Sequence, residues 1–186
     1  MLPLALNLND KDVLVIGAGR IGTGKARLLV DAGARVTLIA REFVSELPRG
    51  LAFFDERAYR EGDLRGYDLV VSATGDATVN DRIVEEARRE HVWLNVVDDP
   101  ARSDFYFTAV HRDGDVVVSV STEGASPALA QELRSMIAER LPDNLSDVAQ
   151  QLRRERAELH AHGSSTEGVD WRPRIRELLG GSEPSR

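Results

Sequence analysis

Apolar residues in the first half of the chain form short, dense runs. These runs are rich in β-branched residues and lie at residues 13–16, 35–40, 51–54, 69–73 and 92–96. Runs of this length bounded by turn residues are typical of buried strands. They predict five strands, and they also predict a core position for Trp93 in the last run.

Two segments between these runs carry apolar residues at helical spacing. Residues 21–32, which end at Gly33, and residues 78–90 each predict a helix. Strands that alternate with helices of this length indicate βαβ units and a parallel sheet. The first part of the chain therefore predicts an α/β fold with a Rossmann-like, doubly wound parallel sheet.

The pattern changes after Pro100. Apolar residues 105–111 and 116–121 flank the pair Asp113-Gly114, which favours positive φ and predicts a β-hairpin. The chain there no longer alternates strands with crossover helices, so a second module begins.

Helical periodicity resumes at Ser126-Pro127, a cap residue followed by proline at the first helical position. This helix is expected to stop at Pro142. Apolar positions near residues 145–159 and 175–179 predict further helices, and the tail, residues 181–186, is expected to fray.

Composition narrows the classes of function. The 186 residues include 24 basic and 31 acidic side chains, a net charge of −7, which argues against nucleic acid as a partner. The absence of cysteine excludes disulfides, thiolate nucleophiles and cysteine-bound zinc. The histidines have no metal-binding spacing, so no resident metal is expected.

The apolar N-terminus has no basic segment or cleavage site typical of a signal peptide. No uncharged apolar run approaches the roughly 18 to 20 residues that span a bilayer. A cytoplasmic protein without a membrane partner is expected.

A G-x-G-x-x-G motif directly follows the first predicted strand and opens the first helix. Its candidate cofactor-binding residues are Gly17, Gly19, Arg20, Ile21 and Gly22. In such turns one glycine permits the tight turn, one lets the backbone approach a pyrophosphate, and one allows close packing of helix and strand. The alternative is a glycine-rich turn that holds no ligand.

The second strand ends in Ala40-Arg41-Glu42, where an acidic residue usually holds the ribose of NAD. Arg41 could accommodate the 2′-phosphate of NADP, or it could be a solvated arginine at the end of a strand. The residues therefore leave the choice between NAD and NADP open. Thr74, after the fourth strand, is a further candidate for contact with the cofactor.

Two carboxylates, Asp98 and Asp99, follow the last predicted strand at the sheet edge where α/β proteins bind ligands. Asp98 is the candidate general base. Asp99, which precedes Pro100, is interpreted as a turn residue. The loop at residues 120–127 carries hydroxyl groups that can bind anions, or Ser126 is simply a helix cap.

Several stretches of the chain occur together in one known group of enzymes. They include Met1-Leu2-Pro3-Leu4, Val15-Ile16-Gly17-Ala18-Gly19, Lys25-Ala26-Arg27-Leu28-Leu29, Asn95-Val96-Val97-Asp98-Asp99-Pro100 and Ser126-Pro127-Ala128-Leu129-Ala130. With these residues the chain resembles the precorrin-2 dehydrogenases and the N-terminal dehydrogenase/ferrochelatase modules of siroheme synthases.

The resemblance implies NAD as cofactor and oxidation of precorrin-2 to sirohydrochlorin, and some members also insert ferrous iron as a second substrate. It implies that Asp98 removes a proton and that Thr122 lies in the loop lining the tetrapyrrole cleft. We therefore take Thr122, Gly124 and Ser126 as candidate substrate-binding residues.

The resemblance also implies a homodimer. It predicts an NAD-binding domain at residues 1–110, a dimerisation segment of hairpin and helix at 111–141, and a small C-terminal helical part at 142–186. The alternative function is a regulatory domain that senses a nucleotide without turning it over.

Overall fold

The structure is a computed structural model that describes residues 2–43 and 46–180. It divides into two compact units, Met1–Tyr106 and Phe107–Arg186, and each is described by itself. The tail, residues 181–186, lies outside the described residues. The three-part division at residues 110 and 141 stays a prediction.

The first unit is built on a five-stranded parallel sheet with the strand order β3-β2-β1-β4-β5. Its strands are β1 (Asp12–Ala18), β2 (Arg35–Phe43), β3 (Phe53–Glu56), β4 (Leu69–Ser72) and β5 (Trp93–Val96). The order reverses between β1 and β4, so the ligand crevice of such a sheet is expected at their carboxyl ends. The predicted doubly wound α/β fold is confirmed.

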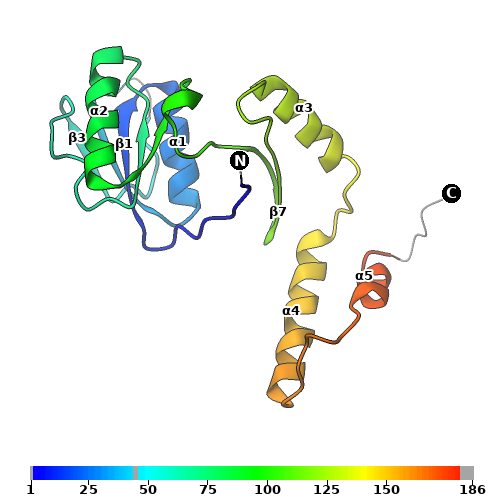
Figure 1. Cartoon of the computed structure of the whole chain (residues 1–186). Coiled ribbons are helices and arrows are strands. Elements are labelled where there is room, and N and C mark those ends of the chain that lie inside the picture. The colour runs from blue at the N-terminus through cyan, green and yellow to red at the C-terminus, as the bar shows by residue number, and fades with distance from the viewer. Residues whose placement is uncertain (1, 44–45, 181–186) are drawn as a thin grey trace. The chain divides into compact units, whose positions relative to one another are not determined.

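Two helices cover the sheet, α1 (Arg20–Asp31) and α2 (Ala77–Glu90), and they lie on opposite faces (Figure 1). Asp76 caps α2 with its carboxylate, and His91 ends the helix in the left-handed conformation with a φ of 55°. Successive strand residues point to opposite faces. Leu14 and Ile16 therefore pack with Ile83 on the α2 side.

A buried carboxylate ties α2 to the connection between β3 and β4. Glu86 is only 1% exposed. It accepts hydrogen bonds from the Tyr59 hydroxyl, from the Gly62 N–H at 3.0 Å and from the Leu64 N–H at 2.9 Å. A buried charge is tolerated where several donors satisfy it, so this contact fixes the long connection on the sheet.

Trp93 corrects a sequence prediction, because its side chain is 49% exposed rather than part of the core. It is the first residue of β5, which is the last strand of the sheet and has a neighbour on one side only. The third strand also lies later than predicted, at Phe53–Glu56.

A short 3₁₀ helix, η1 (Pro100–Arg102), follows β5. Beyond it the chain folds back on the sheet: the Asp104 N–H donates to the Leu94 carbonyl at 2.7 Å, and Asn95 Nδ2 donates to the Phe105 carbonyl at 2.8 Å. These bonds hold residues that were predicted to open the hairpin, so its first strand begins only at Ala109.

The second unit contains the antiparallel hairpin β6 (Ala109–Asp113) and β7 (Val116–Val120) and the helices α3 (Pro127–Ala138), α4 (Leu145–Ala161) and α5 (Arg172–Leu178). The α3 helix packs on both strands of the hairpin. Asp113 accepts from the Ser146 N–H at 3.0 Å, and Arg174 Nη2 lies 2.5 Å from Glu155 Oε1 between α5 and α4. Within the described part of the chain, no helix is long and apolar enough to cross a membrane.

Candidate functional site

The glycine turn after β1 has two glycines that the fold itself requires. Gly17 has a φ of +105°, and a Cβ there would lie 2.5 Å from the Ala73 carbonyl oxygen. A Cβ on Gly22 would lie 1.9 Å from the Gly17 carbonyl oxygen, so only glycine lets α1 approach the turn.

Gly19 is different, because a Cβ there would meet no protein atom within 4 Å. Its backbone is extended, with a φ of −69°, a conformation open to any residue. The protein therefore does not need glycine at this position for its own packing. Open space beside the turn is what a pyrophosphate approaching the backbone would use.

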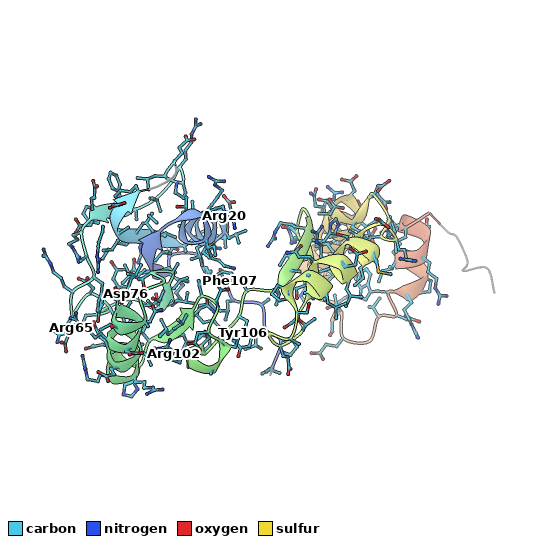
Figure 2. All side chains as sticks on the ribbon, turned by 90° about the horizontal axis from the view of Figure 1, so that it is seen from above. Arg20, Arg65, Asp76, Arg102, Tyr106 and Phe107 are labelled. Atoms are coloured by element: carbon cyan, nitrogen blue, oxygen red, sulfur yellow. The ribbon has the colours of Figure 1, made fainter. Side chains whose placement is uncertain are left out.

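The first turn of α1 faces the same edge of the sheet and carries the exposed residues Arg20 and Ile21. Figure 2 shows Arg20 at the start of this helix. The first N–H groups of a helix have no partner within the helix and carry partial positive charge. No acidic residue lies in this turn to compete for them. The turn can therefore hold an anion beside Gly19.

The loop after β4 is fixed by a network of side chains. Ser72 Oγ and Thr74 Oγ1 both donate to Asn80 Oδ1, at 2.6 and 3.2 Å. Thr74 Oγ1 also accepts from the Asp76 N–H at 3.1 Å. The predicted cofactor residue Thr74 thus has a firm structural role, and the part of Asn80 in holding it was not foreseen from the sequence.

Asp76 pairs with Arg41 across the end of β1. Arg41 Nη2 lies 3.7 Å from Asp76 Oδ2. Since β1 stands between β2 and β4, this ion pair spans the strand end that carries the glycine turn. Asp76 was not predicted as a site residue, although an Asp directly before a helical segment is a capping signal.

Asp98 lies directly beyond β5 with an exposed side chain and a φ of +61°. The left-handed conformation is uncommon for residues other than glycine, and Asp and Asn tolerate it best. The turn is held by Ser103 Oγ, which donates to the Asp99 carbonyl at 2.8 Å and accepts from the Val96 N–H at 2.9 Å. Asp98 is thereby presented at the edge of the sheet.

Asp99 has the turn role predicted for it. Its carboxylate accepts from the Arg102 N–H at 3.3 Å and from Arg102 Nε at 2.5 Å. Arg102 also reaches Asp81 on α2 at 2.6 Å. Asp99 is therefore engaged in structure, which leaves Asp98 as the carboxylate available for chemistry.

Lys25 on α1 is a second residue near the site whose position was not predicted from the sequence. Burial lowers the pKa of its half-buried ammonium group, and the negative charge of Asp98 opposes that shift. Asp98 and Lys25 are far apart in the sequence, but they lie close enough at one edge of the sheet for the charge of Asp98 to affect the Lys25 pKa.

The three predicted substrate residues lie together in the second unit. Thr122 Oγ1 donates to the Ser126 carbonyl at 3.0 Å and accepts from the Ser126 N–H at 3.1 Å. Ser126 Oγ accepts from the Leu129 N–H at 3.2 Å, so Ser126 caps α3. Gly124 has a φ of +84°.

Among the residues that the structure describes, no group of three or more His, Asp and Glu could hold a metal ion.

Comparison with known proteins gives close relatives for most of the chain. It is 39% identical over 152 residues to a siroheme synthase of Methylococcus capsulatus and 41% identical over 151 residues to one of Ectopseudomonas mendocina. Each match covers 80% of this chain and 32% of the relative, so the chain spans about a third of their length. The resemblance found in the sequence is confirmed.

A solved structure titled "SirC, precorrin-2 dehydrogenase" shares the fold. It superposes with a TM-score of 0.70 over 97% of this chain and 88% of that chain, at 23% sequence identity. Residues 4–109, more than half of the chain, match a family described as "Putative NAD(P)-binding". With the glycine turn and the strand order already described, this match shows that the chain belongs to that NAD(P)-binding family.

Proposed function

We propose that this chain is an NAD-dependent dehydrogenase that oxidises precorrin-2 to sirohydrochlorin. The observation that carries the proposal is one edge of one sheet that offers both an open approach at Gly19 and an exposed carboxylate at Asp98. The names of the relatives, siroheme synthase and precorrin-2 dehydrogenase, supply the substrate.

Gly17, Gly19 and Gly22 shape the turn for a dinucleotide, and the N–H groups of Arg20 and Ile21 face its pyrophosphate. Thr74 lies on the neighbouring loop. Bound NAD⁺ supplies the acceptor for the hydride that leaves a C–H bond of the substrate.

Asp98 accepts the proton that the substrate loses in the same oxidation. The substrate loses two electrons and two protons in total. One proton and both electrons leave as hydride to NAD⁺, and the second proton goes to the carboxylate, so the products besides the oxidised substrate are NADH and one proton. The exposed position of Asp98 lets it pass this proton to water. Lys25 adds a positive charge near this carboxylate.

The substrate is a polycarboxylated tetrapyrrole, and the loop with Thr122, Gly124 and Ser126 is our candidate for binding it. Its support is the exposed left-handed turn at Glu123 and Gly124, with φ values of 51° and 84°, in front of α3. The start of α3 directly after this turn carries partial positive charge, which favours a carboxylate.

The partner that we propose is a second copy of the chain. The α3 helix packs on the hairpin with one face and exposes Leu129, Leu133, Met136 and Ile137 on another. A contiguous apolar helix face in a small unit is typical of an interface. We place the protein in the cytoplasm.

The deciding experiment adds precorrin-2 and NAD⁺ to the purified chain without oxygen and follows NADH absorbance. Stoichiometric NADH and sirohydrochlorin are expected. Binding of NAD⁺ without any turnover would instead favour the alternative, a domain that senses a nucleotide. Addition of ferrous iron to the product tests the chelatase activity that some similar enzymes have.

A further inference from the structure

The dinucleotide site has a cation where related sites have an anion. At the end of β2 an acidic residue usually binds the ribose hydroxyls of NAD, whereas an arginine accommodates the 2′-phosphate of NADP. Here the exposed Arg41 follows the buried Ala40. Arg41 considered alone therefore favours NADP, in conflict with the NAD of the proposed function.

The structure supplies a partner for this arginine. The Arg41 guanidinium lies 3.7 Å from the Asp76 carboxylate, and the two side chains are 68% and 44% exposed. They come from β2 and from the loop after β4, on either side of β1. On the β2 side, Arg41 stands at the strand end where the adenosine ribose of a dinucleotide would be held.

Asp76 is held firmly in this position. Its Oδ1 accepts from the Thr78 and Val79 N–H groups at 3.0 and 3.1 Å as the cap of α2, and its own N–H donates to Thr74 Oγ1 at 3.1 Å. Oδ2 is the oxygen directed to Arg41. Because the cap fixes the carboxylate, only Arg41 loses side-chain freedom in forming the pair.

We propose that Asp76 is a specificity-determining residue, which holds Arg41 away from a 2′-phosphate and so makes the site select NAD over NADP. The inference rests on the proposed dinucleotide site. A 2′-phosphate would have to separate Arg41 from Asp76 and would then lie near the fixed negative charge of Asp76. A ribose hydroxyl is neutral, so it neither has to separate the ion pair nor is repelled by Asp76.

Asp76→Asn is the variant that isolates this effect. Asparagine is as good a helix cap as aspartate, so α2 keeps its start while the charge is removed. Asp81→Asn is the matched control, because Asp81 is an exposed carboxylate on the same helix that pairs with Arg102 instead. Thermal unfolding checks that both variants fold like the parent.

Calorimetric titration of NAD⁺ and NADP⁺ into the parent, Asp76→Asn, Asp81→Asn, Arg41→Ala and the Arg41→Ala/Asp76→Asn double variant gives the test. We expect the parent to prefer NAD⁺. Asp76→Asn should tighten NADP⁺ binding by about threefold or more, in line with the strength of an exposed ion pair, and leave NAD⁺ binding nearly unchanged. The gain should shrink in the Arg41→Ala background, and Asp81→Asn should show none.

Three results overturn the inference: a parent that prefers NADP⁺, an unchanged ratio of affinities in Asp76→Asn, or an equal gain without Arg41. In each of these cases a dinucleotide still binds, so the proposed dehydrogenation survives, but a parent that prefers NADP⁺ would replace NAD as its cofactor. If the folded parent binds neither dinucleotide, the proposed function fails, and this inference fails with it.

Discussion

Gly17, Gly19 and Gly22 occupy one turn, yet they lack side chains for different reasons. A Cβ on Gly17 or Gly22 would collide with backbone oxygen atoms, whereas one on Gly19 would point into open space. The fold therefore accounts for two of the glycines, and the proposed approach of a pyrophosphate accounts for the third.

Gly19→Val should abolish NAD⁺ binding while the chain still folds. The added side chain meets no protein atom but fills the approach to the pyrophosphate. We expect the free energy of unfolding to fall by only about 1 kcal/mol, because Gly19 is the N-cap of α1 and valine is a poorer cap than glycine. Calorimetry measures binding, and denaturant titration measures stability.

Gly24→Val is the control for this variant. Gly24 lies on α1, and a Cβ there also meets nothing within 4 Å, so binding should be retained. An NAD⁺ affinity of Gly19→Val within about threefold of the parent would show that the turn does not hold the phosphates.

Asp98→Asn tests the proton acceptor without disturbing its unusual backbone. Asparagine also tolerates the left-handed conformation at a φ of +61°, but it cannot accept a proton at neutral pH. Turnover should fall by about 10²- to 10⁴-fold, the usual contribution of a general base, while NAD⁺ binding stays intact. Steady-state rates together with calorimetry separate these effects.

The matched control is Asp99→Asn, which changes a turn carboxylate that binds Arg102. It should lower stability more than turnover. More than about half the parental rate in Asp98→Asn would refute the assignment. Where the parent inserts ferrous iron, a parallel loss in Asp98→Asn would assign both reactions to one cleft.

At the scale of elements, Glu86 and Tyr59 join α2 to the connection after β3. Burial and the hydrogen bond to Glu86 raise the pKa of the Tyr59 hydroxyl above its ordinary value of 10.0. The folded pKa exceeds the unfolded one, so this contact stabilises the fold fully below about pH 10 and is lost as the pH rises further.

Tyr59→Phe should lower the free energy of unfolding by about 1–3 kcal/mol at neutral pH, because a buried carboxylate loses one of its donors. It should also remove part of the loss of stability above pH 10. Urea titrations of parent and variant at neutral and alkaline pH give both values. Equal alkaline sensitivity in the two proteins would exclude Tyr59 as its source.

The sequence predicted elements better than it predicted contacts between them. Buried strands such as β1 and β4 are continuous apolar runs, and α1 and α2 have clear helical periodicity, so all four were found. The start of β6 was predicted too early, at Phe105. Hydrogen bonds to Leu94 and Asn95 hold Asp104 and Phe105 on the parallel sheet, so the hairpin begins after them.

For the site too, local features could be predicted from the sequence and contacts between distant elements could not. The glycine turn and Asp98 could be proposed from the sequence because each directly follows a predicted strand. Asp76 and Lys25 could not be proposed in this way, because their partners are far away in the sequence: Arg41 lies on β2 and Asp98 lies just beyond β5. Only the strand order brings each pair together. No local pattern carries that information.

At the scale of the whole molecule, the exposed face of α3 predicts association. Leu133→Asp places a charge on this face and should convert a dimer into a monomer. Gln131→Asp puts the same residue on an exposed polar position of α3 and should leave the dimer intact. Light scattering at micromolar concentration measures the mass, and a monomeric parent would remove the dimer from the proposed function.

The division of the chain into two compact units gives it two built-in fluorescent reporters. The first unit contains Trp93 and the second contains Trp171, and these are the two tryptophans of the sequence. If each unit has its own stability, emission from Trp93→Phe and from Trp171→Phe variants should report denaturation midpoints that differ. Addition of NAD⁺ should then raise only the midpoint that Trp93 reports, since a ligand stabilises the unit to which it binds.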